Sequence, residues 1–108
     1  MTQRYPLVLN GSSIQELQNG DVFTITAINE TKVAMAANNI DLATGNYFSK
    51  TISGATTLTV SNVPTTGSVG SFILDLTNGG SGTITWFTGV KWASGTAPTL
   101  TAAGRDVL

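Results

Sequence analysis

The chain offers few side chains that could do chemistry. It contains neither cysteine nor histidine, which excludes thiolate nucleophiles, Ser-His-Asp and Cys-His arrangements, and metal sites built on Cys or His ligands. Acid–base chemistry would fall to six carboxylates, which stand at Glu16, Asp21, Glu30, Asp41, Asp75 and Asp106. Glycoside hydrolysis needs two carboxyl groups held roughly 5 to 9.5 Å apart, and no spacing here indicates such a pair. We therefore expect no enzymatic activity, no catalytic residue, no cofactor and no metal.

The individual carboxylates also have ordinary interpretations. Asp21 follows an Asn-Gly turn, and Glu30 lies beside Asn29, so both are typical loop residues. Asp75 falls in the middle of a predicted strand, where we expect a solvated or hydrogen-bonded surface role. The glycine-rich stretch 79–82 is typical of a turn and matches no phosphate-binding motif.

Three aromatic residues could bind a sugar, because flat aromatic faces stack on sugar rings. The strand phase of Trp86 places it among apolar neighbours and favours packing in the core. Trp92 lies next to a Gly-Thr-Ala-Pro loop, which leaves open a core position, a subunit interface and a ligand contact. Tyr47 would join a sugar-binding surface only if it were exposed together with Trp92.

The charge balance argues against several partners. Five cations and six carboxylates give a net charge of −1, and the cations are spread along the chain, so we expect no nucleic-acid binding. No apolar run approaches the ~20 residues of a membrane helix, and the first residues lack the apolar core of a secretory signal. We expect a soluble protein made in the cytoplasm. Charged residues make up only 10% of the chain, which favours association for a β-protein.

Frequent turn signals divide the chain into short runs with strand chemistry. Thr, Val and Ile are abundant, which favours pleated sheet over helix. Turns recur roughly every ten residues, as in a sandwich or barrel. The predicted strands are residues 6–9, 13–17, 22–28, 31–36, 47–52, 57–60, 69–77 and 83–90. Residues 40–42 could be a strand or a single turn, and residues 106–108 resemble the beginning of a strand.

These elements predict one all-β module spanning residues 1–108. We expect a β-sandwich or jelly-roll-like arrangement of about eight short antiparallel strands. A division is also conceivable, in which residues 1–30 form an N-terminal strand or attachment segment and residues 31–108 form the main sandwich.

The clearest local prediction is a hairpin across residues 78–82. A three-residue loop would pair Leu76 with Ile84 and Leu74 with Trp86, whereas a loop of even length would mix the two faces. The predicted core face of this hairpin consists of Phe72, Leu74, Leu76, Ile84 and Trp86.

The opposite face of this hairpin carries Ile73 and Phe87 as cross-strand neighbours. Paired apolar residues away from the main core indicate a second packing layer. That layer could come from another strand or loop of the same chain, or from a neighbouring subunit. The interface candidates are therefore Ile73, Phe87, Trp92 and Tyr47.

Two stretches carry a resemblance to a known class of proteins. Residues 6–21, PLVLNGSSIQELQNGD, resemble the β-rich segments that open modules in tail-fibre and other appendage proteins of tailed phages. Residues 40–108, with SFILDLTNGG, ITW and VKWASGTAPTLT, are similar to a module that recurs in phage virion structural proteins. In such modules the Asp-Val-Leu segment leads into a further strand and an aromatic-rich ending, which this sequence lacks.

The resemblance implies a virion component that forms a trimer or part of a larger symmetric assembly. We expect a non-enzymatic structural protein of the tail fibre, neck or baseplate, made in the host cytoplasm and working in the virion beside other virion proteins. One alternative is a decoration protein that cements the capsid surface. The second is a host-attachment module that binds a surface glycan.

Overall fold

The computed structural model describes residues 7–10, 13–16, 19–22 and 24–108. These residues form ten short strands and two 3₁₀ turns, so the predicted β class is confirmed. The strands are β1 (Leu7–Asn10), β2 (Ser13–Glu16), β3 (Val33–Ala34), β4 (Asn39–Asp41), β5 (Tyr47–Thr51), β6 (Thr56–Thr57), β7 (Thr59–Ser61), β8 (Ile73–Thr77), β9 (Ile84–Thr85) and β10 (Arg105–Val107). The turns are η1 (Gly79–Ser81) and η2 (Ala93–Gly95).

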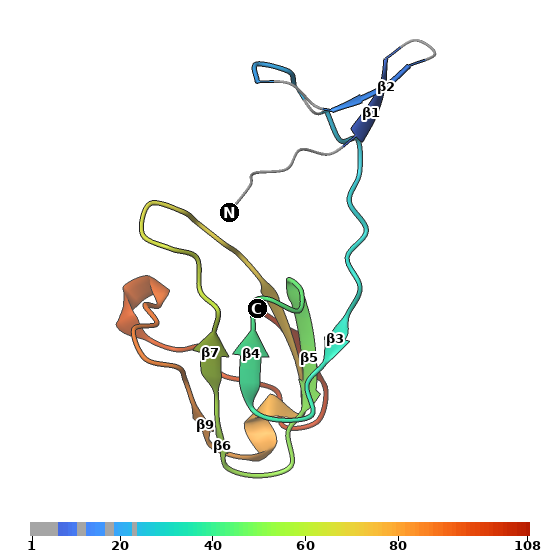
Figure 1. The fold of residues 1–108 in the computed structure, drawn as a ribbon. Helices are drawn as coiled ribbons and strands as arrows, with labels where there is room; N and C mark the ends of the chain where they lie inside the picture. Colours follow the sequence, from blue (N-terminus) through green and yellow to red (C-terminus); the bar gives the residue numbers. More distant parts are fainter. Residues whose placement is uncertain (1–6, 11–12, 17–18, 23) are drawn as a thin grey trace.

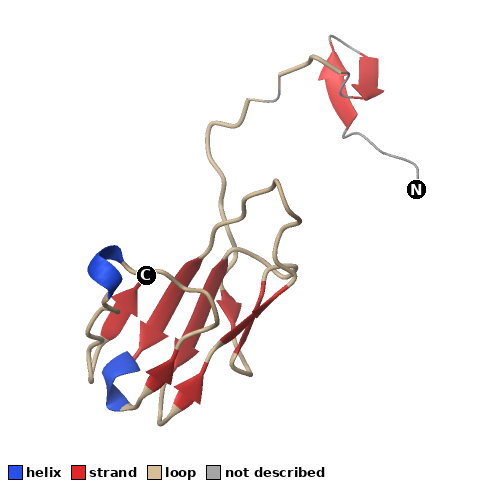
Figure 2. Ribbon diagram, turned by 90° about the vertical axis from the view of Figure 1, so that its left-hand side faces the viewer, coloured by secondary structure: helices blue, strands red, loops and turns tan. Residues whose placement is uncertain are grey.

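The largest sheet has four strands in the order β10-β8-β5-β3. Its centre is parallel, because β5 pairs with β8 on one side and with β3 on the other in the same direction. Only β10 runs antiparallel to its neighbour β8. Figures 1 and 2 show this sheet on one side of the body, with β4, β6, β7 and β9 facing it.

The facing strands form two further parallel pairs, β4 with β7 and β6 with β9. The prediction of antiparallel pairing is therefore wrong for most of the body. From β3 onward, each strand belongs to a different sheet from the strand before it. Because consecutive strands of this body do not pair, each connection crosses from one sheet to another, and the strands that do pair can run parallel.

The predicted hairpin is wrong for the same reason. Leu76 lies between Lys50 and Asp106 in the four-stranded sheet, whereas Ile84 pairs with Thr56. Between them the chain turns through η1, entered by Asn78 in the left-handed region at φ 57°. The turn carries β9 away from β8 into another sheet, so an argument from hairpin loop length does not apply.

The core lies where the sheets face one another. Its fully buried members are Ile40, Phe48, Ile52, Leu58, Leu74 and Leu76. Along β8, Leu74 and Leu76 share the face that points into this core, whereas Asp75 between them is buried on the opposite face. Three further predicted core residues, Phe72, Ile84 and Trp86, are partly buried and pack against this cluster.

An arm connects this body to the antiparallel hairpin of β1 and β2. The described part of the predicted strand 22–28 forms no strand and pairs with no other strand. Val22, Ile25 and Ile28 are 86, 51 and 70% exposed. The chain extends 56 Å along its longest axis, with a radius of gyration of 18.7 Å, against about 13 Å for a compact domain of this length.

Candidate functional site

An ion pair between a buried carboxylate and an exposed arginine lies on the four-stranded sheet. Asp75, in the middle of β8, is 2% exposed. The Nε of Arg105, on the adjacent strand β10, donates to both carboxylate oxygens at 2.8 and 2.9 Å, and Nη2 lies 2.7 Å from Oδ2. The Tyr47 hydroxyl donates to Oδ2 at 2.9 Å and accepts from Arg105 Nη2 at 3.0 Å. Three strands thus contribute to one closed polar network.

The network explains the protonation state of its members. Hydrogen bonding to Arg105 lowers the pKa of Asp75, and the bond from Tyr47 and the charge of Lys32 act in the same direction against the cost of burial. The pKa of Arg105 is raised, chiefly by its bonds to Asp75. The expected solvated or hydrogen-bonded surface role of Asp75 is right about the hydrogen bonds and wrong about the surface position, because the carboxylate is buried.

A polar hollow of about 450 Å³ opens beside this network. Its lining includes three of the five cations of the chain, Lys32, Lys50 and Arg105. The cations are spread along the chain, but sheet pairing brings three of them to one hollow. Hydroxyl-bearing residues complete the lining: Ser49, Thr51 and Thr77. Cations beside hydroxyls suit an anionic, hydrogen-bonding ligand, although Asp75 neutralises part of the positive charge.

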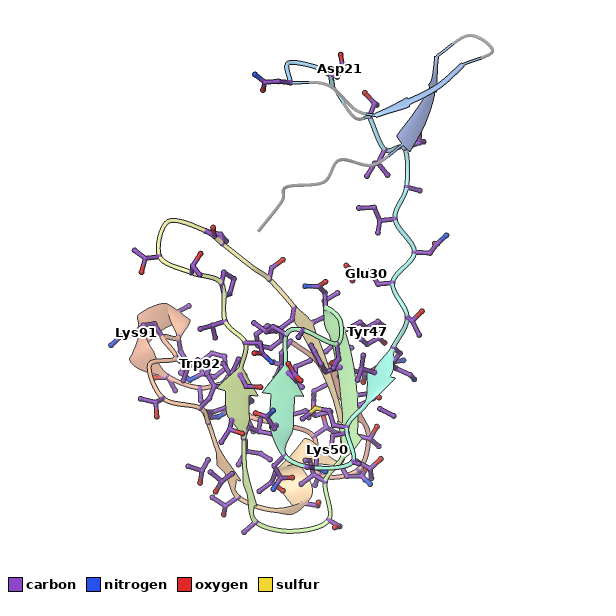
Figure 3. All side chains as sticks on the ribbon, viewed as in Figure 1. Asp21, Glu30, Tyr47, Lys50, Lys91 and Trp92 are labelled. Atoms are coloured by element: carbon purple, nitrogen blue, oxygen red, sulfur yellow. The ribbon has the colours of Figure 1, made fainter. Side chains whose placement is uncertain are left out.

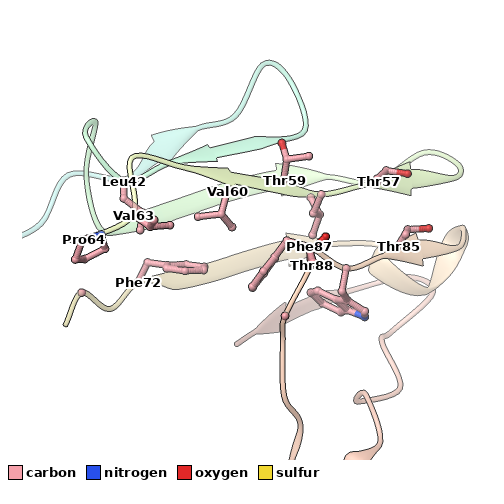
Figure 4. A pocket seen from close by; sticks show the side chains of 14 residues that line it. Leu42, Thr57, Thr59, Val60, Val63, Pro64, Phe72, Thr85, Phe87 and Thr88 are labelled. Atoms are coloured by element: carbon pink, nitrogen blue, oxygen red, sulfur yellow. The ribbon is translucent and has the colours of Figure 1, made fainter. Parts of the chain in front are cut away.

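A second, larger hollow is the groove, about 630 Å³ in volume, between residues 57–64 and residues 85–89 (Figure 4). Its apolar wall consists of Leu42, Leu58, Val60, Val63, Pro64, Phe72, Trp86 and Phe87. Threonines form much of the remainder, at positions 57, 59, 85 and 88, and none of the lining residues is charged. Such a surface suits an apolar, uncharged occupant.

The predicted interface residues lie in different places. Tyr47 belongs to the ion-pair network, and Ile73 is 42% exposed at the start of β8. Phe87 lines the groove and contacts Phe72, with ring centroids 6.2 Å apart. The prediction that Ile73 and Phe87 are cross-strand neighbours is wrong, because Ile73 pairs with Tyr47.

Trp92 packs against Trp86 edge to face, with ring centroids 4.9 Å apart. Both rings are partly buried. Figure 3 shows Trp92 and Tyr47 on opposite sides of the body, so the two do not form a common sugar-stacking surface.

Two further carboxylates, Asp41 and Asp106, stabilise loops. Asp41 accepts hydrogen bonds from the Ala43 amide at 3.0 Å and from the Asn62 side chain, and these bonds lower its pKa. Asp106 accepts from the amide and hydroxyl of Thr101 at 2.7 and 2.9 Å. Among the described residues, no three acidic side chains gather as a metal site.

Sequence reasoning missed Arg105, Lys32 and the groove wall around Val63. One signal was available: a carboxylate within the apolar run Phe-Ile-Leu-Asp-Leu requires a partner if the strand is buried. The partner itself lies 30 residues away, so no local pattern could identify it.

Comparison with known proteins adds no family to this description. No protein-family model matches the chain, and neither a curated protein nor a solved structure is similar enough to count as a match. In the part of the chain that the structure describes, no helix has the length and apolarity to cross a membrane.

Proposed function

We propose that this chain is a non-enzymatic structural module of a tailed-phage virion, a component of the tail fibre, neck or baseplate that works by symmetric assembly with copies of itself. The observation that carries the proposal is the exposed arm. Val22, Ile25 and Ile28 are largely exposed although the segment has strand chemistry. Exposed β-branched residues in an unpaired segment promote aggregation of a monomer. In a subunit of an assembly, the same residues are buried against a neighbour.

The shape of the molecule supports the same proposal. A radius of gyration of 18.7 Å means that part of the chain lies far from its own core. In an oligomer the arm would bury against a neighbour and contribute stability that the small core of the body does not supply alone. A homotrimer, held beside other virion proteins after synthesis in the host cytoplasm, fits the resemblance of residues 6–21 and 40–108 to phage appendage modules.

The module would have two parts. Residues 1–30 would serve as an attachment segment, and residues 31–108 would form a sandwich-like body. Core residues from both sides support this description: Ile40 on β4 and Phe48 on β5 belong to opposing sheets and share one cluster.

A capsid decoration protein is the first alternative, since a cementing subunit would also use an exposed arm. A glycan-binding attachment module is the second, and one observation favours it. Lys32, Lys50 and Arg105 border a hollow together with three hydroxyl-bearing residues, which suits a sugar carrying a carboxylate or sulfate.

Labelling of intact phage particles tests the proposal. An antibody raised against the purified chain should bind virions at the tail, neck or baseplate in electron micrographs, with pre-immune serum as the control. Labelling spread over the head would favour the decoration protein, and the absence of labelling on particles whose genome encodes the chain would overturn a virion function.

A further inference from the structure

β7 has one edge that pairs with β4 and a second edge that faces the apolar groove. In the parallel pair of β4 and β7, the Thr59 amide donates to Asn38 at 3.0 Å, and the Leu42 amide donates to Ser61 at 3.1 Å. Thr59 and Ser61 therefore direct their backbone groups toward β4. Since backbone groups alternate along a strand, the N–H and C=O of Val60 point the other way.

β9 pairs along this second edge, but only with β6 and not with β7. The Thr56 amide donates to Thr83 at 2.9 Å and the Leu58 amide donates to Thr85 at 2.8 Å. The register between β6 and β9 ends at Thr57 and Thr85. Beyond this point the two segments diverge, and the groove lies between them. The edge at Val60 thus continues past the end of its partner strand.

The same chain carries a segment with matching properties. Residues 24–28, Thr-Ile-Thr-Ala-Ile, have strand chemistry and no charge, and they pair with none of the strands that the structure describes. In an extended strand, Ile25 and Ala27 share one face, and the side chains of Thr24 and Thr26 point the opposite way. An uncharged groove with an apolar wall fits the Ile25 face.

We propose that residues 24–28 of a second copy add as a strand to the free edge of β7 in this groove. The proposal rests on the proposed function, and it names the segment and the surface through which the copies would assemble. Main-chain hydrogen bonds to Val60 would supply affinity, and the contact of Ile25 with Val63 and Phe87 would set the register.

The direction of the arm explains why the occupant comes from a second copy. Figure 1 shows the arm leaving β3 and leading away from the body, not across it toward β7. On this arm Ile25 and Ile28 are 51 and 70% exposed, so residues 24–28 do not fill the groove of their own chain. The arm instead presents the segment to a neighbour.

Cross-linking between two differently tagged copies tests the proposal. The chain has no cysteine of its own, so Ile25→Cys in one copy and Val63→Cys in the other are the only reactive thiols in the mixture. A short bismaleimide should yield a heterodimer within minutes. The matched control replaces Val63→Cys with Val107→Cys, which is similarly exposed at 58% against 64% but lies on β10. This pair should cross-link at least tenfold less.

A charge substitution gives the second readout. Ile25→Asp should raise the concentration at which copies associate at least tenfold, whereas Thr26→Asp, on the other face of the same strand, should change it less than threefold. Both residues lie outside the core, so the far-ultraviolet circular dichroism of each variant should match that of the unmodified chain.

The outcomes distinguish failure of this docking mode from failure of the proposed function. A chain that assembles without the Ile25–Val63 cross-link, and whose Ile25→Asp variant assembles equally well, overturns the docking mode and leaves the virion proposal standing. A chain that stays monomeric overturns the docking mode together with the self-assembly part of the proposed function. A chain with both cysteines that cross-links internally as a monomer places the arm in its own groove and overturns docking in trans.

Discussion

The Nε of Arg105 donates hydrogen bonds to both oxygens of the buried Asp75 carboxylate, at 2.8 and 2.9 Å. The pair joins β10 to β8, two strands that are neighbours in the sheet and 30 residues apart in the chain. Such a contact holds the antiparallel edge strand in register, because a shift would leave a buried charge without a partner.

The pair predicts how stability depends on pH. The folded-state pKa of Asp75 is lowered, so its stabilising contribution is complete above the ordinary pKa of about 3.9 and is lost as pH falls through the lowered value. In Arg105→Gln the carboxylate stays buried and loses its strongest partner, so its pKa rises. Acid unfolding followed by circular dichroism should then begin at a higher pH than in the unmodified chain.

Two controls accompany that experiment. Tyr47→Phe removes a smaller contribution to the Asp75 pKa and should shift the acid midpoint less than Arg105→Gln does. Lys50→Gln removes a cation that contributes nothing to the lowered pKa of Asp75 and should not shift the midpoint. An equal shift in all three variants would mean that general surface charge, and not the pair, sets the acid stability.

Two glycines after β8 are predicted to be intolerant of alanine for a reason unrelated to turn conformation. A Cβ on Gly80 would collide with the Leu100 carbonyl oxygen, and a Cβ on Gly82 would collide with the Gly54 carbonyl oxygen. In both cases backbone packs on backbone, so no side chain can move aside. Gly80→Ala and Gly82→Ala should each lower the free energy of unfolding by about 1–3 kcal/mol, measured by urea denaturation.

Gly54 provides the matched control for these variants. Its own Cβ would meet nothing within 4 Å, and its φ is not in the left-handed region. Gly54→Ala should therefore leave stability unchanged or increase it slightly. A loss at Gly54 as large as that at Gly82 would contradict the close-approach argument.

The two faces of β8 should respond differently to truncation. Leu76 is fully buried, and Leu76→Ala should cost about 2–5 kcal/mol of unfolding free energy. Ile73, 42% exposed on the same strand, should cost less than half as much when truncated. If Ile73 contributes to a subunit interface, Ile73→Asp should weaken association without changing the unfolding of the dissociated chain.

The tryptophan pair predicts a measurable coupling. Trp86 and Trp92 contact each other edge to face at 4.9 Å, a geometry worth about 0.5–1.5 kcal/mol beyond buried area. A double-mutant cycle of Trp86→Leu and Trp92→Leu, measured by thermal unfolding, should return a coupling in that range. A coupling indistinguishable from zero would mean that Trp92 is held by its loop and not by its partner ring.

Sequence patterns predicted the β class and the positions of several strands. The predicted segments 47–52 and 69–77 contain β5 and β8, because strand-forming residues between turn signals depend only on local chemistry. The core positions of Leu74 and Leu76 follow from the alternation of Phe72, Leu74 and Leu76 along the second segment.

Strand pairing could not be predicted in this way. A hairpin was the simplest partner arrangement for β8, but the chain leaves the sheet after η1 and returns to it only at β10. The close backbone contacts at Gly80 and Gly82 that accompany this crossing are between residues roughly 20 to 30 apart. No local pattern encodes them.

The candidate sites depended on the same long-range pairing. Lys32, Lys50 and Arg105 come together only because β3, β5 and β10 belong to one sheet. The groove exists because β9 pairs with β6 for two residues and then diverges. Composition predicted association in general, through the low fraction of charged residues, but it could not predict the surface.

The mass of the purified chain in solution tests the central claim most directly. Light scattering behind a sizing column, at two concentrations at least tenfold apart, should give about three times the 11.2 kDa of a single chain at the higher concentration, with the mass falling on dilution only if association is weak. A mass of one chain at both concentrations would contradict self-assembly and would shift the interpretation to a module that docks onto other virion proteins or binds a glycan.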